Sequence, residues 1–279
     1  MGYSAQYLSA SLLADGWSIA GTSQTVDKCV AISKYGVDVH LFNTEQSLED
    51  ISQLARVTHI LSSVPPDKDD DPVLRHHGRE IVEMPNLQWV GYLSATSVYG
   101  DTGGAWVDET ADCCPTSERA RQRMAAEARW LRLKKVPVHI FRLAGIYGPR
   151  RSAFDRLRLG QAKRIDQPDR LFSRIHVDDI VTILRASIAQ PNPGSIYNLC
   201  DDKPASNADV IAYAAELLGV DPPPLLAMAD ASLSPLAQSF YRDNRLVTNR
   251  RIKEELNIAL QYPDYLTGLR AILEKEVQT

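Results

Sequence analysis

The sequence lacks the features that identify several large classes of protein. No apolar run approaches the ~20 residues that a membrane-spanning helix needs. The start of the chain has neither the basic region nor the apolar core of a secretory signal peptide. The four cysteines form no CxxC pair, so we interpret them as reduced thiols. These absences predict a cytoplasmic protein without a membrane partner.

The sequence also lacks an excess of charge of either sign. It contains 31 basic and 35 acidic residues, which give a net charge of −4. Proteins that bind nucleic acid usually combine a basic surface with aromatic side chains for stacking. Segment 117–135 is locally basic, but Ala120, Met124, Ala128 and Leu131 fall on one helical face, which indicates a solvated amphipathic helix. We therefore expect no nucleic-acid partner.

Metal-binding patterns are missing as well. The adjacent Cys113 and Cys114 have no histidine or further cysteine at ligand spacing. The acidic run DKDDDP (67–72) lacks the spaced ligands and terminal glutamate of a calcium loop. We interpret that run as the start of a helix, where the helix dipole favours acidic side chains. No metal site is predicted.

Short apolar runs alternate with amphipathic stretches along most of the chain. This alternation predicts βαβ units, a parallel sheet and a Rossmann-type α/β fold. We predict a dinucleotide-binding domain over residues 1–150 and a smaller substrate lobe over 151–279, interleaved with the end of the sheet. The predicted strands are 16–23, 37–42, 58–66, 87–100 and 136–149, and the predicted helices are 26–36, 48–57, 72–84, 117–135, 206–219 and 265–276.

The chain opens with MGYSA, which matches the last four positions of the phosphate-binding pattern G-x-G-x-x-A. In such a turn, glycine lets the backbone approach a pyrophosphate, and the helix N-terminus supplies N–H groups and a positive dipole end. Gly2 would be the middle glycine and Ala5 the small residue at helix packing distance. We predict that Gly2, Tyr3, Ser4 and Ala5 contact the cofactor.

The next predicted strand ends in GTSQ. An NAD-preferring protein usually carries Asp or Glu there to bind the ribose hydroxyls. Thr22, Ser23 and Gln24 leave room for a 2′-phosphate instead, so we predict NADP as the cofactor, with NAD as the alternative. The competing interpretation is that Thr22 and Ser23 only cap the following helix.

A hydrophobic strand should precede the phosphate-binding turn in this topology. Losing about five buried apolar side chains at ~2 kcal/mol each would forfeit on the order of 10 kcal/mol. We therefore expect the natural chain to begin roughly ten residues earlier, which is the length of a strand and a turn.

Five segments together resemble the extended branch of the short-chain dehydrogenase/reductase superfamily, the NAD-dependent epimerases and dehydratases. The segments are MGYSA, YLSATSVYG followed by VDE, FRLAGIYGP, FSRIHVDDIV and YNLCDD. The resemblance implies a Rossmann domain that binds NAD(P), a small C-terminal substrate lobe and a nucleotide-sugar substrate. In that family the helix over 117–135 often builds a dimer interface, so we expect a monomer or a homodimer.

At the family's catalytic positions, this chain has residues of other types. The resemblance places its tyrosine at Arg119, its lysine at Arg123 and its Ser/Thr at Ala95. Arginine cannot exchange a proton near neutral pH, so Arg119 cannot replace the tyrosine as a base. Arg123 could still donate hydrogen bonds to the cofactor. The pattern resembles the atypical subgroup of the superfamily, which lacks the Tyr–Lys pair.

Two functional interpretations follow. The protein is an oxidoreductase or isomerase whose acid/base group is non-standard, or it binds nucleotide without catalysis, as a sensor would. For the first, the local candidates are Tyr99, Ser97 and Thr96, at the end of a predicted strand. The alternative role of Tyr99 is to pack the VYG turn.

The remaining candidates follow from strand ends and from the resemblance. Ligands bind at the carboxyl ends of strands in open α/β sheets. Further cofactor contacts are therefore predicted at Ser63, Val64, Pro65, Ser94, Ala144 and Gly145. Tyr147, Arg174 and Arg245 are predicted to contact substrate, the arginines because guanidinium suits bidentate phosphate binding. For each arginine the alternative is a surface ion pair.

Overall fold

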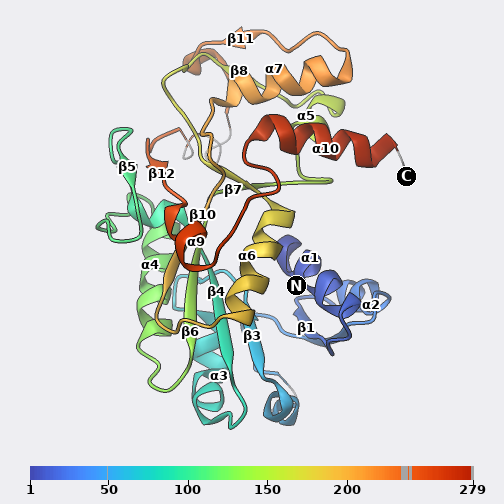
Figure 1. Ribbon diagram of the computed structural model, residues 1–279, viewed down its shortest axis with the longest axis vertical. Coiled ribbons are helices and arrows are strands. Elements are labelled where there is room, and N and C mark those ends of the chain that lie inside the picture. The colour runs from blue at the N-terminus through green and yellow to red at the C-terminus, as the bar shows by residue number, and fades with distance from the viewer. Residues whose placement is uncertain (49, 234–237, 239–240, 278–279) are drawn as a thin grey trace. The chain divides into compact units, whose positions relative to one another are not determined.

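The computed structural model describes residues 1–48, 50–233, 238 and 241–277, and the chain forms two compact units (Figure 1). The first unit comprises Met1–Ala95, Glu118–Arg142 and Val181–Tyr197. The second comprises Thr96–Ser117, Leu143–Ile180 and Asn198–Thr279. The segments of the two units alternate along the sequence, and the domain boundary predicted at residue 150 lies within the second segment of the second unit.

Parallel strands joined by helices form the first unit, which confirms the predicted α/β fold class (Figure 1). Strand β1 (Ala20–Ser23) pairs in parallel with β2 (Asp38–Leu41). A second sheet has the order β10-β6-β4-β3, and β3 pairs with β4 in parallel. Its strands are β3 (His59–Ser62), β4 (Trp89–Ala95), β6 (Val138–Leu143) and β10 (Ile196–Leu199). The helices are α1 (Tyr3–Ala14), α2 (Val26–Ser33), α3 (Pro72–Glu83), α4 (Glu118–Leu131) and most of α6 (Val177–Ala189).

The two sheets of the first unit come close without joining. Strand β1 has only β2 as a partner and β3 only β4 among the described residues. Trp17, just before β1, packs edge-on against His59 at the start of β3, with ring centroids 4.9 Å apart. A hollow of about 350 Å³ lies here, lined by Leu12, Trp17, His59, Gln88, Arg185, Ile188 and Ala189. Because its strand residues lie at or before strand starts, this hollow is at the edge opposite the carboxyl ends.

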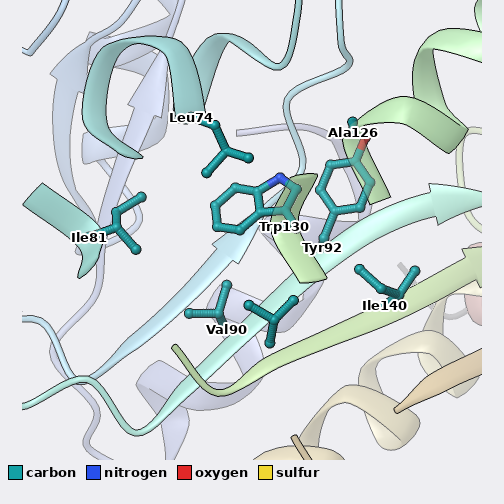
Figure 2. Packing of buried hydrophobic residues seen from close by; sticks show 8 residues of the cluster. Leu74, Ile81, Val90, Tyr92, Ala126, Trp130 and Ile140 are labelled. Atoms are coloured by element: carbon teal, nitrogen blue, oxygen red, sulfur yellow. The ribbon is translucent and has the colours of Figure 1, made fainter. Parts of the chain in front are cut away.

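A buried cluster of aromatic and aliphatic side chains joins helices α3 and α4 to the second sheet (Figure 2). Tyr92 of β4 stacks on Trp130 of α4, with ring centroids 6.0 Å apart. The indole N–H of Trp130 donates to Asp71 at 3.0 Å, and Asp71 also accepts the N–H of Leu74 at the start of α3. One carboxylate thus caps α3 and fixes α4 against it, as the apolar contacts alone would not.

The second unit consists of paired short strands and helices. Strand β7 (Gly145–Tyr147) pairs with β9 (Arg174–His176) in parallel, and the other pairs are β5 (Trp106–Val107) with β12 (Leu246–Val247) and β8 (Arg164–Ile165) with β11 (Leu225–Leu226). Tyr147, Phe154 and Leu269 belong to its core. Besides the first residues of α6, the helices of the second unit are α5 (Ala153–Arg158), α7 (Asn207–Leu218), α9 (Arg250–Glu255) and α10 (Tyr265–Val277).

Several predicted boundaries are wrong, and local geometry explains them. The helix expected over 48–57 is a 3-10 helix, Ile51–Arg56, too short for a stable α-helix. The strand expected over 87–100 ends at Ala95 and continues as the 3-10 helix Thr96–Tyr99. The run over 136–149 divides into β6 and β7. Helix α6 begins within FSRIHVDDIV, where no helix was predicted.

The apolar face predicted for α4 is only partly right, because Ala120 is buried but Ala128 and Leu131 are exposed. The helix buries Ala120, Ala126, Glu127 and Trp130, whereas Leu131 is 39% exposed. Tertiary contacts determine which face of the helix is buried, because Glu127 forms an ion pair with Arg142 and Trp130 donates a hydrogen bond to Asp71. No helix in the described part of the chain combines the length and apolarity of a membrane span.

Candidate functional site

The start of α1 and the end of β1 lie together in the first unit. The N-terminal amine of Met1 donates to the carbonyl of Thr22. Gly2 is the N-cap of α1, and no side chain caps this helix end. A Cβ added to Gly2 would meet nothing within 4 Å, so the backbone there faces open space. Helix N–H groups without a side-chain cap are suited to an anion.

The predicted first-turn residues differ in exposure. Ser4 and Ala5 are buried at 5% and 8%, so their side chains pack inward. Ser23 is buried at the end of β1, Thr22 is half-buried and Gln24 is exposed. Thr25, rather than Thr22 or Ser23, accepts the Lys28 N–H as the N-cap of α2. The structure thus brings the predicted phosphate and ribose residues to one place and contains no carboxylate at the end of β1.

Buried hydroxyls line the carboxyl half of β3 and β4. Ser62 and Ser94 are 3% and 2% exposed, and neither hydroxyl has a hydrogen-bond partner among the described residues. Ser62 lies opposite Tyr92 in the parallel register, and Ser94 follows two residues later on the same face. Buried polar groups are normally hydrogen-bonded, so this row is a place for a polar ligand. Ser63, Val64 and Pro65 follow directly after Ser62.

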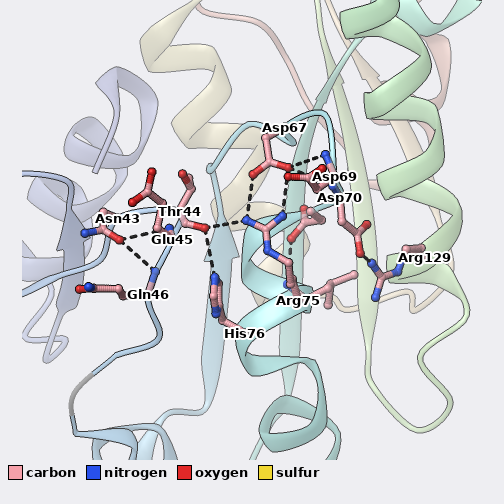
Figure 3. A network of polar contacts seen from close by, with 12 residues as sticks. Asn43, Thr44, Glu45, Gln46, Asp67, Asp69, Asp70, Arg75, His76 and Arg129 are labelled. Carbon is pink, nitrogen blue, oxygen red and sulfur yellow. Dashed lines mark hydrogen bonds and ion pairs between the residues drawn. The ribbon is translucent and has the colours of Figure 1, made fainter.

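The loops that follow β2 and β3 are held to each other by charged side chains (Figure 3). Asp67 accepts two hydrogen bonds from Arg75 at 3.0 and 2.9 Å, and Arg75 also donates to the Thr44 carbonyl at 2.6 Å. Asp70 pairs with Arg129 of α4. Asp67 and Asp70 are thus engaged in ion pairs, and Asp71 caps α3. No group of three or more potential metal ligands occurs among the described residues.

The two arginines at the family's catalytic positions differ in environment. Arg119 is exposed on the first turn of α4. Arg123 is half-buried, and its Nη1 donates to the Leu93 carbonyl of β4 at 3.0 Å. Arg123 therefore lies next to the buried hydroxyl on β4. One of its nitrogens is already engaged in a hydrogen bond to the backbone of that strand. Neither side chain can act as a base.

In the second unit, the catalytic candidates lie on the 3-10 helix Thr96–Tyr99. Tyr99 is 1% exposed, and its hydroxyl donates to the Asn198 side-chain oxygen at 2.7 Å. Glu109 accepts the Asn198 N–H at 2.7 Å, which fixes that partner in turn. This geometry favours the packing role for Tyr99 over the catalytic one. Thr96 is 8% exposed and Ser97 half-buried.

Strands β7 and β9 bring most of the predicted substrate residues together. Gly145 lies opposite Arg174, and Tyr147 opposite His176. The Tyr147 hydroxyl donates to the Asp264 carbonyl at 3.2 Å. Gly268 is required beside it, because a Cβ there would lie 2.1 Å from that hydroxyl. Ala144 donates its N–H to the Leu199 carbonyl at 3.0 Å, so the end of β10 adjoins the same place.

The two predicted substrate arginines have different surroundings. Arg174 donates through Nη1 to the carbonyls of Phe172 and Ala205, at 2.7 and 2.8 Å. Its guanidinium lies 5.8 Å from the Phe172 ring, which packs edge-on against Tyr241 at 5.4 Å. Arg245 instead donates to the Gly100 carbonyl at 2.9 Å and pairs with Asp243 at 3.1 Å. Arg245 thus holds the VYG turn and is not brought to Arg174 by any contact in the described chain.

Four residues of the second unit were not predicted from the sequence: Asn198, Asp201, Phe172 and Tyr241. Asn198 and Asp201 belong to YNLCDD and Phe172 to FSRIHVDDIV, both used only as family markers. The available signal for Asp201 was a pair of adjacent acids that begins two residues after a buried strand. Tyr241 carries no signal, since its place beside Phe172 arises from tertiary structure.

The first unit fits a nicotinamide dinucleotide by three features of its own residues. A side chain at Gly2 would meet no other atom within 4 Å, the side chains at the end of β1 are small and uncharged, and the Ser62 and Ser94 hydroxyls have no hydrogen-bond partner among the described residues. These features accommodate a diphosphate, a ribose and further polar ligand atoms respectively.

Comparisons with known proteins agree with this architecture. No model of a known protein family matches the chain. A functionally unknown conserved protein from Silicibacter pomeroyi is 48% identical, with a TM-score of 0.93 and coverage of 98% of this chain and 96% of that one. Protein YeeZ of Escherichia coli K12 is 27% identical over 277 residues, or 95% of each chain.

A more distant solved structure is similar in fold alone. It is the UDP-glucuronic acid 4-epimerase of Bacillus cereus in complex with NAD, which is 15% identical, with a TM-score of 0.77 and coverage of 99% and 96%. The chain therefore belongs to the same family as the Silicibacter pomeroyi protein, and it has the fold of the epimerase/dehydratase-like branch of the short-chain dehydrogenase/reductase superfamily, as the resemblance in sequence predicts.

Proposed function

We propose that the protein binds a nicotinamide dinucleotide through its first unit and acts as an oxidoreductase or isomerase on a nucleotide-sugar substrate. The observation that carries the proposal is the pair of buried hydroxyls at the carboxyl ends of β3 and β4, Ser62 and Ser94, which have no hydrogen-bond partner in the described part of the chain. A bound nicotinamide would supply hydride transfer. NAD in the Bacillus cereus epimerase supports the cofactor class, and UDP-glucuronic acid in its name supports the substrate class.

Arg174 and its aromatic neighbours are the residues of the second unit that suit such a substrate. A guanidinium binds a diphosphate through charge-assisted hydrogen bonds, and Phe172 and Tyr241 provide ring faces for a base. The proton-transfer group is not a Tyr–Lys pair. Of the predicted candidates, the half-buried Ser97 is the more open, since Tyr99 donates its hydroxyl to Asn198.

The second candidate function is nucleotide binding without catalysis. The hydrogen bond from Tyr99 to Asn198 favours it, because it commits the only phenol among the three predicted catalytic residues to the packing of its own unit. Arg119 and Arg123 favour it as well, since neither exchanges protons near neutral pH. Cofactor binding is common to both functions, so only turnover separates them.

Calorimetry is expected to show tighter binding of NADP⁺ than of NAD⁺, because no carboxylate at the end of β1 repels the 2′-phosphate.

The change Gly2→Asp is expected to weaken binding of either cofactor at least tenfold, since its carboxylate would enter the space proposed for the diphosphate. Asp is also a favoured N-cap, so the melting temperature should hold or rise. Gly2→Asn is the matched neutral control. Equal binding by Gly2→Asp and Gly2→Asn would contradict this assignment.

Turnover is expected when the protein is incubated with NADP⁺ or NADPH and a panel of nucleotide sugars. The triple change Ala95→Ser, Arg119→Tyr and Arg123→Lys restores the residue types of the standard site. We expect it to raise the rate of cofactor reduction if the substrate site is intact. Persistent silence of both proteins, with the cofactor bound, would favour the sensor function.

A further inference from the structure

Asp201 carries a buried carboxyl group that forms no ion pair and no well-aligned hydrogen bond within the described residues. It lies two residues after β10 and is 2% exposed, and neither carboxyl oxygen has a hydrogen-bond partner in the described part of the chain. Its backbone N–H donates to the Arg174 carbonyl at 2.6 Å, which fixes it beside β9. A buried ionised carboxylate without hydrogen bonds is strongly disfavoured, so this position needs a specific reason.

Arg174 is the cation whose charge acts most strongly on Asp201, and the two form no ion pair among the described residues. Only Nη1 of Arg174 is engaged, with the Phe172 and Ala205 carbonyls, and its other two nitrogens have no partner among the described residues. Guanidinium and carboxyl group thus lie near each other with unused hydrogen-bonding capacity on both sides. That arrangement suits an anionic ligand at Arg174 and a protonated Asp201.

The charge state of Asp201 follows from its surroundings. Burial raises the pKa of Asp201 to about 8, and the positive charge of Arg174, together with weak contacts to the backbone N–H groups of Lys203 and Arg174, only partly opposes this. The other groups that face it are the Tyr147 hydroxyl on β7 and, on its own segment, the Cys200 thiol and the Asp202 carboxylate. Asp202 itself pairs with Lys253. Near neutral pH, Asp201 is therefore largely protonated.

We propose that Asp201 is a specificity-determining residue that competes with the anionic group of a ligand for Arg174. With its proton bound, Asp201 leaves the guanidinium to a diphosphate. When the proton leaves, the carboxylate turns to Arg174 and excludes the anion. The ligand class rests on the proposed function, whereas the competition between Asp201 and an anion at Arg174 does not.

Calorimetric titration with UDP-glucose between pH 6 and pH 9 tests the proposal. Its diphosphate has no terminal phosphate monoester, whose second pKa of about 6 would confound the measurement. Affinity of the wild type is expected to be about tenfold weaker at pH 9 than at pH 7, since only the protonated fraction is competent to bind. Asp201→Asn should bind equally at both pH values. Asp202→Asn, which removes the neighbouring exposed carboxylate, should keep the wild-type slope.

A second measurement needs no nucleotide. The Asp201 carboxyl is titrated by NMR of protein labelled with ¹³C-aspartate, with and without sulfate, which stays dianionic over this range. Sulfate is expected to raise the pKa of Asp201 in the wild type and to leave it unchanged in Arg174→Met. A response in both proteins, or in neither, would overturn the competition. Failure of UDP-glucose to bind at any pH, with the sulfate response intact, would reject only the nucleotide-sugar class.

Discussion

Replacing Glu127 with alanine is expected to lower the free energy of unfolding by about 3–5 kcal/mol. Arg142 of β6 donates to Glu127 of α4 from Nε at 3.2 Å and from Nη2 at 2.8 Å. The two side chains are only 5% and 4% exposed. Removing the carboxylate would leave the guanidinium buried without its counter-ion, and water could not replace it. Urea denaturation followed by far-ultraviolet circular dichroism measures the loss.

Two controls separate this burial effect from loss of an ion pair in general. Glu118→Ala removes the partner of Arg121 in an exposed pair on the same helix, with side chains 69% and 52% exposed, and should cost under about 1 kcal/mol. The double change Glu127→Leu with Arg142→Met should recover most of the stability, because apolar side chains of similar volume can replace a buried pair. Similar losses for Glu127→Ala and Glu118→Ala would refute the interpretation.

The Glu127–Arg142 ion pair shows why part of the fold could not be predicted from the sequence. The order of strands and helices is encoded locally, by apolar runs, by Pro72 in the first turn of α3 and by glycines at turns, so most elements were found. Glu127 sits among basic residues in a segment that reads as a solvated helix. Its burial depends on Arg142, fifteen residues later in β6, and no local pattern encodes that contact.

In the candidate site as well, residues in local motifs could be predicted, whereas contacts between distant segments could not. Gly2, Thr22 and Ser23 were predicted from local motifs, and the structure brings them together at the start of α1 and the end of β1. Arg245 and Tyr99 were also chosen from sequence. Their contacts with Gly100 and Asn198 arise from distant segments, so their engagement could not be anticipated.

A five-residue apolar strand joined ahead of Met1 through a short turn is expected to raise the melting temperature by about 5–10 °C. Met1 lies beside the end of β1, because its amine donates to Thr22. A strand leading up to Met1 would therefore run parallel to β1 and β3, between the two edges that have no partner strand among the described residues. Five buried apolar side chains at ~2 kcal/mol each supply on the order of 10 kcal/mol, and backbone hydrogen bonds to both edges add to this, against about 1.5 kcal/mol for each residue ordered. Each kcal/mol corresponds to about 2–4 °C in a chain of this size.

Calorimetry of this variant should be compared with a variant that carries a Gly-Ser segment of equal length. The strand variant should also quench or shift the fluorescence of Trp17, which lines the hollow at the amino ends of β1 and β3. A melting temperature equal to that of the Gly-Ser control would show that no strand enters between the sheets. A higher one without a change at Trp17 would mean that the segment binds elsewhere. Only the two signals together place it between β1 and β3, because only there would one strand complete both edges.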